Sequence, residues 1–160
     1  MKVFYDPVIF IVDKNTTFQK VTQQYLNVAG YTESLIFSDY SECIKYLDLK
    51  PDIVISDYFD TPPVTSEDFI NKLKKISPKT YVIFLSSSGD LNNAITLMQK
   101  GAIDYILKSN SAYNRLIHII KSIHLYNTDL IKTSRSNKTI ATSIGILAAL
   151  MGFLLYLYKI

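Results

Sequence analysis

Cysteine, glycine and tryptophan are scarce in this chain of 160 residues, which has one cysteine, five glycines and no tryptophan. Because Cys43 is the sole cysteine, no disulfide can form within the chain, and this agrees with a reducing compartment. The sequence has neither a Walker loop nor a G-x-G-x-x-G motif, which excludes the common glycine-rich phosphate-binding loops. His118 and His124 lie too far apart on one predicted helix to indicate a metal site.

Charge and proline are both absent from residues 139–158 (TIATSIGILAALMGFLLYLY). A helix of this length rises about 30 Å, which is the thickness of the hydrocarbon core of a bilayer. The segment therefore predicts one transmembrane helix, with a buried core helix or a non-spanning amphipathic helix as the alternative. Ala141, Gly145, Ala148 and Gly152 form a stripe of small residues, which predicts a weak homodimer or docking to a membrane partner unless their spacing is due to chance.

Basic residues flank this apolar segment. Lys132, Arg135 and Lys138 precede it and Lys159 follows it, and with the single acid Asp129 they account for the formal net charge of +3. Because cytoplasmic flanks carry the excess of lysine and arginine, the preceding domain is expected to face the cytoplasm. The predicted location is the cytoplasmic (inner) membrane, with a single membrane pass.

Ahead of this segment, short apolar runs alternate with longer segments of helical periodicity. The pattern predicts strands at 8–12, 35–37, 52–56, 81–85 and 103–107, and helices at 16–29, 41–49, 67–76, 91–100 and 112–126. In the first helix, Phe18, Val21, Tyr25 and Val28 are expected to share the buried face. Strict alternation of this kind is typical of the α/β class, with a doubly wound five-stranded parallel sheet. The predicted domains are a globular domain at 1–126, a polar and basic linker at 127–138 and the transmembrane helix at 139–158.

Side chains suited to chemistry follow four of the five predicted strands. Asp13 and Lys14 follow the first strand, Asp57 the third, Ser86 the fourth and Lys108 the fifth. Because the carboxyl ends of parallel strands meet at one edge of the sheet, these side chains should converge there. A carboxylate can attack a phosphoryl group, a second can hold Mg²⁺, and a hydroxyl with an ammonium group can bind the phosphoryl oxygens.

Each of these residues also has a structural interpretation. Asp13 and Asp57 are able to accept hydrogen bonds from backbone N–H groups at helix starts. Ser86 suits a helix cap or a loop, Lys108 suits a solvated strand end, and Tyr105 suits ordinary packing. The residue types alone leave both interpretations open.

Four motifs make the chain resemble the receiver domains of two-component response regulators. They are IFIVDKN around Asp13, PDIVISDY (51–58), VIFLSSSGD (82–90) and GAIDYILKS (101–109), and the resemblance extends over about residues 6–126. It implies a flavodoxin-like sheet of strand order 2-1-3-4-5. It also implies Asp57 as phosphoacceptor, Asp13 and the Phe59 backbone carbonyl as metal ligands alongside Asp57, Ser86 and Tyr105 as switch residues, and Lys108 as the lysine that contacts phosphate.

The chain departs from the family pattern at two positions that matter for chemistry. Lys14 stands where the family has a second metal-binding acid, and it is expected either to pair with Asp57 or to point into solvent. One unit charge near 4 Å is worth about 4 kcal/mol at an effective dielectric of about 20, so Mg²⁺ binding is expected to be weakened or absent. Ser109 replaces a proline that often follows a cis bond, and because a non-proline cis bond costs about 2.5–4 kcal/mol, a trans or adjusted loop is expected.

These observations favour a membrane-tethered, single-domain response regulator. It would receive a phosphoryl group on Asp57 from a histidine kinase or phosphotransfer protein, and signal to a downstream protein through the face around Tyr105 and the last helix. No enzyme activity is expected beyond self-catalysed phosphoryl acceptance and autodephosphorylation, and no nucleic-acid partner is expected. The alternative is a phosphorylation-independent, receiver-like membrane adaptor in which Lys14 replaces a metal-binding acid. An enzyme of the flavodoxin-like class is a third interpretation, which lacks a cofactor loop.

Overall fold

The computed structural model describes the backbone of residues 6–158, but not the side chains of residues 135, 137 and 144–158. The chain divides into two compact units, Met1–Lys121 and Ser122–Ile160. The first unit contains a parallel sheet and helices α1 to α4, and the long helix α5 (Ala112–Tyr158) begins in it. The described part of the second unit is the remainder of α5.

The sheet of the first unit has five strands, all parallel. They are β1 (Ile9–Val12), β2 (Ser34–Phe37), β3 (Ile53–Ser56), β4 (Tyr81–Ser86) and β5 (Asp104–Leu107). Their order in the sheet is β2-β1-β3-β4-β5, with Val12 in register with Phe37 and with Ser56. The predicted strand order is therefore confirmed, and each predicted strand lies within two residues of the observed one.

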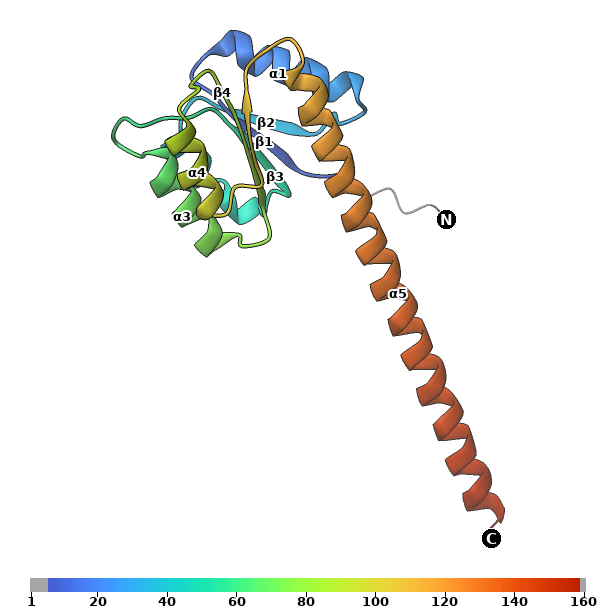
Figure 1. Ribbon diagram of the computed structural model, residues 1–160. Helices are drawn as coiled ribbons and strands as arrows, with labels where there is room; N and C mark the ends of the chain where they lie inside the picture. The colour runs from blue at the N-terminus through green and yellow to red at the C-terminus, as the bar shows by residue number, and fades with distance from the viewer. Residues whose placement is uncertain (1–5, 159–160) are drawn as a thin grey trace. The chain divides into compact units, whose positions relative to one another are not determined.

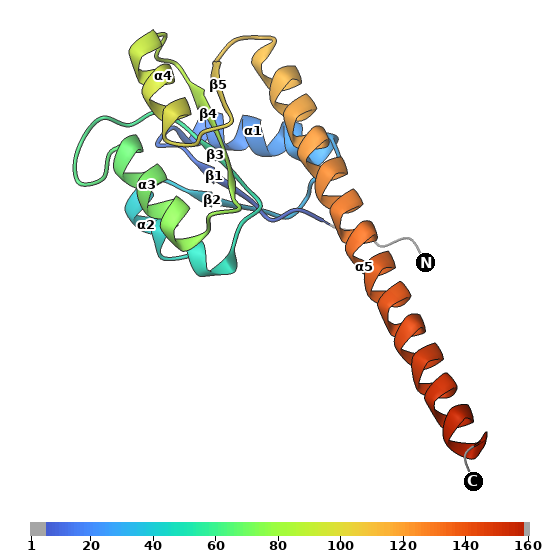
Figure 2. The same cartoon turned by 60° about the horizontal axis from the view of Figure 1, so that its bottom comes forward.

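Helices cover both faces of this sheet. Figure 1 shows α3 (Ser66–Ile76) and α4 (Leu91–Gln99) on one side and α1 (Thr16–Val28) on the other, and Figure 2 shows the same division from a second direction. The first side holds a core cluster, with Phe10, Phe69 and Phe84 among its fully buried members. Because β1 and β3 are buried on both faces, β1 is apolar throughout and β3 is apolar up to its last residue, Ser56. The polar residues that follow mark the edge where a site can form.

The buried face of α1 differs from the predicted one. Gln19, Thr22 and Leu26 are its buried residues, whereas Val28 is 83% exposed. The Gln19 side-chain amide donates to the backbone carbonyl of Asp13 at 2.6 Å, which satisfies its buried N–H group. The predicted buried face was therefore wrong. The helix instead buries the face that carries Gln19, whose polar side chain has backbone partners.

The predicted helix at 41–49 was also wrong in its extent. The structure has a short helix α2 (Tyr40–Ile44) and then a 3₁₀ turn η1 (Leu47–Leu49). Asp39 caps α2 by accepting from the Glu42 N–H group, and Lys50 after the 3₁₀ turn has a positive φ of 51°. This tighter segment keeps Tyr40, Cys43 and Leu47 buried.

Helix α3 starts at Ser66, one residue before the predicted start, and Thr65 caps it. Thr65 accepts a hydrogen bond from the Asp68 N–H group, and the Asp68 side chain accepts from the Thr65 backbone, which is a complete capping box. This cap fixes where the β3–α3 loop, residues 57–65, must end. The loop contains a cis bond between Pro62 and Pro63.

Helix α5 starts at the predicted residue, Ala112, but it runs on past residue 126. Residues 127–138, predicted as a polar linker, are helical, so the expected helix end was wrong while the domain boundary itself stays a prediction. In the second unit Thr142 and Ser143 donate their hydroxyl hydrogens to the backbone carbonyl of Thr139.

The predicted membrane span at 139–158 lies largely outside the residues whose side chains are described. The same holds for Gly145, Ala148 and Gly152 of the small-residue stripe, whereas Ala141 is described and is exposed. Among the residues that were described, no helix combines the length and the apolar character that crossing a membrane requires.

Candidate phosphoacceptor site

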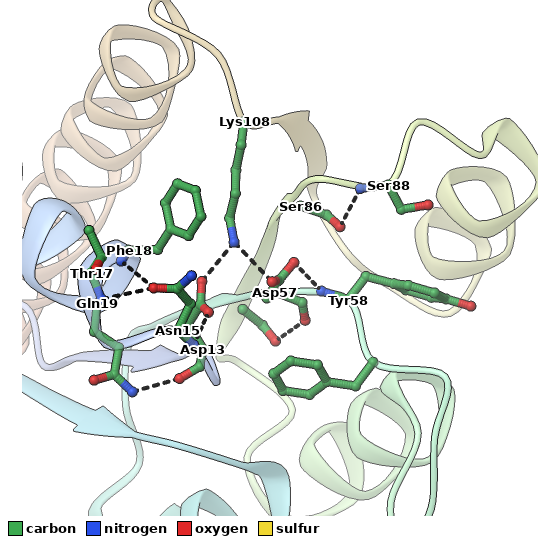
Figure 3. A network of polar contacts seen from close by, with 12 residues as sticks. Asp13, Asn15, Thr17, Phe18, Gln19, Asp57, Tyr58, Ser86, Ser88 and Lys108 are labelled. Carbon is green, nitrogen blue, oxygen red and sulfur yellow. Dashed lines mark hydrogen bonds and ion pairs between the residues drawn. The ribbon is translucent and has the colours of Figure 1, made fainter.

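The side chains of Asp13, Asp57 and Lys108 meet at the carboxyl edge of the sheet. The Lys108 ammonium group donates to Asp13 Oδ2 at 2.8 Å and to Asp57 Oδ2 at 2.9 Å, as Figure 3 shows. Only 6% of the Lys108 side chain, 8% of the Asp13 side chain and 19% of the Asp57 side chain are exposed. The predicted convergence is therefore observed for these three residues, and Lys108 is a bridging cation and not a solvated strand-end lysine.

Each carboxylate divides its two oxygens between the backbone and Lys108. Asp13 Oδ1 accepts from the Asn15 N–H group at 2.8 Å, and Asp57 Oδ1 accepts from the Tyr58 N–H group at 2.8 Å. Both carboxylates therefore accept a backbone hydrogen bond in addition to their contact with Lys108. Because one oxygen is held by the neighbouring backbone, the other is directed toward Lys108, and both carboxylates are fixed in orientation.

Residues at the start of α1 contact this cluster. Asn15 caps the helix by accepting from the Thr17 and Phe18 N–H groups. The ring of Phe18 lies under the Lys108 ammonium group, 4.1 Å from nitrogen to ring centroid, which is a cation–π contact. Asn15, Phe18 and Gln19 were not predicted as part of the site, although an asparagine directly before a helical pattern is a recognisable cap.

Lys14 does not pair with Asp57; it is exposed, which agrees with the second of the two arrangements expected for it. Its ammonium group lies 3.4 Å from Thr61 Oγ1 and 4.7 Å from the centroid of the Phe59 ring. Among the ion pairs of the described residues, none joins Lys14 to Asp57. The side chain is directed to the β3–α3 loop at the rim of the site, so the buried cluster of two carboxylates and one ammonium group keeps one net negative charge.

Ser86 and Tyr105 both hydrogen-bond to the backbone of Ser88, in the β4–α4 loop. Ser86 is 2% exposed, and its hydroxyl accepts from the Ser88 N–H group at 3.1 Å. The Tyr105 hydroxyl donates to the Ser88 carbonyl at 2.8 Å, while its ring packs 6.2 Å from that of Phe84. Ser86 does not cap a helix, because Asp90 caps α4, and Tyr105 does more than pack. Both backbone groups of Ser88 are therefore held by predicted switch residues.

Ser109 directly follows the bridging lysine. The cis peptide bond found in the described backbone is Pro62–Pro63, so the bond between Lys108 and Ser109 is trans, as expected without proline. The Ser109 carbonyl accepts from the Ala112 N–H group at 3.1 Å. This turn leads directly from Lys108 into α5.

The oxygen atoms that the family resemblance implies as metal ligands already have hydrogen-bond partners. In the described part of the chain, no group of three acidic, histidine or cysteine side chains gathers that could hold a metal ion. The two carboxylates already share the Lys108 ammonium group, and the Phe59 carbonyl accepts from the Ser66 N–H group at 2.7 Å. Mg²⁺ is usually held by one or two carboxylates together with water and phosphate oxygens, so Asp13 and Asp57 would supply such ligands only if Lys108 shared them with the ion.

Comparisons with known proteins agree on one family. The model of the response regulator receiver domain matches residues 9–121. The chain is 31% identical over 101 residues to chemotaxis protein CheY of Thermotoga maritima, covering 62% of this chain and 83% of that protein. It is also 31% identical over 112 residues to the C4-dicarboxylate transport transcriptional regulatory protein DctD of Rhizobium meliloti, but spans only 24% of its length.

A solved structure with the same fold comes from Clostridium thermocellum. This response regulator receiver domain protein superposes with a TM-score of 0.67 at 28% identity, covering 78% of this chain and 98% of that one. A CheY-like receiver domain protein from Methanospirillum hungatei superposes with the same TM-score at 22% identity, and therefore indicates the fold alone.

Proposed function

The chain belongs to the response regulator receiver domain family, and we propose that it receives a phosphoryl group on Asp57 and signals by binding another protein. The observation that carries the proposal is the cluster in which Lys108 bridges Asp13 and Asp57 at 2.8 and 2.9 Å. Receiver domains are signalling modules that interact with histidine kinases or phosphotransfer proteins, so a phosphohistidine is the proposed donor.

The proposed transfer is a displacement at phosphorus. A carboxylate oxygen of Asp57 attacks the phosphorus of the phosphohistidine, a P–O bond forms, and the P–N bond breaks with its electron pair on the imidazole nitrogen, which takes a proton from solvent. Lys108 lies 2.9 Å from Asp57 Oδ2 and neutralises charge that develops on the phosphoryl oxygens. Autodephosphorylation is attack of water on the same phosphorus, which releases inorganic phosphate and restores the carboxylate.

The proposed output is transmitted through the β4–α4 loop. Ser86 can turn its hydroxyl from the Ser88 N–H group to a phosphoryl oxygen, and Tyr105 holds the carbonyl of the same Ser88. The neighbouring surface carries large apolar side chains that are more than one-third exposed: Leu91, Ile95, Met98, Ile103 and Leu107. This patch supports a downstream protein partner.

Incubation of the purified chain with acetyl phosphate tests this function. We expect an acyl-phosphate adduct in the intact mass that hydroxylamine removes and that Asp57→Asn lacks. Asp52→Asn is not a suitable control, because the Asp52 carboxylate holds the Val8 N–H group; the exposed Asp60 provides the matched variant Asp60→Asn. Equal labelling of Asp57→Asn and the wild type would disprove phosphorylation at Asp57.

We further propose that residues 139–158 tether the domain to the cytoplasmic membrane, with the domain in the cytoplasm. The support is the uncharged sequence, the basic flank at Lys132 and Lys138, and the hydroxyls of Thr142 and Ser143, whose hydrogen bonds to Thr139 make them compatible with lipid. Flotation with liposomes tests it, since the full chain should float and a chain ending at residue 138 should not.

A stripe of small residues supports a weak homodimer, which Gly145→Ile with Gly152→Ile should disrupt in a membrane two-hybrid assay.

One observation favours the alternative, a phosphorylation-independent adaptor. Receiver domains typically bind Mg²⁺ for phosphorylation, whereas Lys14 and the engaged Phe59 carbonyl leave this chain two bridged carboxylates. The acetyl phosphate assay distinguishes the two functions. If the wild type forms no adduct at millimolar Mg²⁺ but Lys14→Asp does, the adaptor is favoured.

A further inference from the structure

A buried network of hydroxyl groups lies beneath Asp57, outside the charged cluster. The Tyr40 hydroxyl is within hydrogen-bonding distance of three oxygens: Ser56 Oγ at 2.9 Å, the Asp57 carbonyl at 2.8 Å and Ser66 Oγ at 2.8 Å. Tyr40 and Ser56 are each 1% exposed and Ser66 is 0% exposed. The network joins α2, the end of β3 and the start of α3, which are separated along the chain.

The direction of the hydrogen bonds follows from counting hydrogens. The Asp57 carbonyl can only accept, so Tyr40 donates to it and thereby uses its one hydroxyl hydrogen. Ser66 must then donate its own hydrogen to the Tyr40 oxygen, which leaves a Ser66 lone pair to accept from the Phe59 N–H group at 2.8 Å. A continuous chain therefore runs from the Phe59 amide through two side chains to the Asp57 carbonyl.

Burial keeps this chain in one protonation state. Desolvation raises the pKa of Tyr40 far above that of an exposed tyrosine, so the phenol retains the hydrogen that it donates throughout the physiological range. The Ser56 hydroxyl donates to the same Asp57 carbonyl at 2.7 Å, which fills both of its lone pairs. The ring of Tyr40 is held independently, stacked on Phe69 at 4.2 Å and 11°.

The network acts on the nucleophile through one peptide plane. The carbonyl of Asp57 and the N–H group of Tyr58 belong to the same peptide unit, and that N–H group holds Asp57 Oδ1. We propose that Tyr40, acting with Ser66, is a positioning residue that fixes this peptide unit and so directs Asp57 Oδ2 toward Lys108. The loop is held further along by the Ser66 N–H group, which donates to the Phe59 carbonyl. The inference rests on the proposed function of Asp57, but it can be measured without phosphorylation.

Tyr40→Phe tests it by removing the hydroxyl and keeping the ring. In the full-length chain, well below its melting temperature, the Tyr58 and Phe59 amides should exchange with deuterium about tenfold faster, because a buried hydrogen bond has been lost. The apparent dissociation constant for beryllofluoride should rise about tenfold for the same reason. Tyr46→Phe is the matched control: its ring packs 5.3 Å from Phe37, it is 47% exposed, and both readouts should stay within about twofold.

Ser66→Ala interrupts the same chain from its other end and serves if Tyr40→Phe fails to fold. It should accelerate Phe59 exchange, and in the double variant the effect on beryllofluoride binding should be less than additive because both changes break one chain. A lower melting temperature with unchanged amide exchange and unchanged beryllofluoride binding would overturn the inference, since it would leave Tyr40 a packing role only. If the wild type binds no beryllofluoride, the proposed function fails, and the exchange of Tyr58 and Phe59 still decides the role of Tyr40.

Discussion

The two sides of Asp57 are built from different chemistry. On the β1 side, Asp13 meets the ammonium group of Lys108, whose backbone follows β5; both side chains are charged and mostly buried, and the ammonium group lies 2.8 Å from Asp13 and 2.9 Å from Asp57. On the β4 side, Ser86 and Tyr105 are neutral, and they hold the backbone of Ser88 at 3.1 and 2.8 Å. A buried ion pair is costly to break, whereas a neutral hydrogen bond is exchanged at little cost. The β1 side is therefore suited to hold the nucleophile, and the β4 side to respond to it.

Of the changes considered, removal of the Lys108 ammonium group should lower the stability of the protein most. Lys108→Met leaves two facing carboxylates without their partner, and we expect a loss of about 2–4 kcal/mol in unfolding free energy, reduced by the partial exposure of Asp57. Chemical denaturation measures it, with the exposed Lys20→Met as a control that should change stability by less than about 0.5 kcal/mol. Equal losses in the two variants would show that the cluster is not held by Lys108.

An additional carboxylate on the β1 side should increase the affinity of the site for Mg²⁺. Lys14→Asp replaces an exposed ammonium group at the rim with a carboxylate, and we expect Mg²⁺ to bind about ten- to a hundredfold more tightly than to the wild type. Calorimetric titration measures this affinity, and Lys14→Ala separates removal of the positive charge from addition of a ligand. If Lys14→Asp binds Mg²⁺ no better than the wild type, the identity of residue 14 does not control the metal site.

The β4 side should tolerate the loss of its hydroxyls. Tyr105→Phe and Ser86→Ala each remove one neutral hydrogen bond to Ser88, so each should cost about 0.5–1.5 kcal/mol of unfolding free energy. Denaturation under the conditions used for Lys108→Met gives a direct comparison. A cost as large as that of Lys108→Met would remove the distinction between the two sides.

The smallest effect is expected at the contact between Lys14 and the β3–α3 loop. The Lys14 ammonium group and Thr61 Oγ1 are 3.4 Å apart and exposed, so Thr61→Ala should change stability by less than about 0.5 kcal/mol. Thermal unfolding measures it. A loss above about 1 kcal/mol would mean that this contact orders the loop.

The part of the site that follows from sheet topology could be predicted from the sequence. Polar residues at the ends of apolar parallel strands must meet at one edge, so Asp13, Asp57 and Lys108 could be placed together before any coordinates. Their exact pairing could not, because the pattern does not say whether Lys108 or Lys14 reaches the carboxylates. That depends on the β3–α3 loop, where Thr61 and the Phe59 ring contact Lys14.

Buried polar residues account for most of what the sequence did not reveal. Hydrophobic periodicity placed the wrong face of α1 inward, since Gln19 is buried by virtue of backbone acceptors that no local pattern encodes. Tyr40 was likewise unremarked, because its partners Ser56, Asp57 and Ser66 are 16, 17 and 26 positions away. Contacts over such separations follow from the fold and not from neighbouring residues.

Amide NMR of the full-length chain titrated with beryllofluoride in the presence of Mg²⁺ tests the central claim most directly, with Asp57→Asn as the control. If Asp57 is the phosphoacceptor, the amide signals of Asp57, Ser86, Tyr105 and Lys108 will shift in the wild type and remain in place in Asp57→Asn. An unchanged spectrum at saturating beryllofluoride, or equal shifts in the variant, would contradict the account.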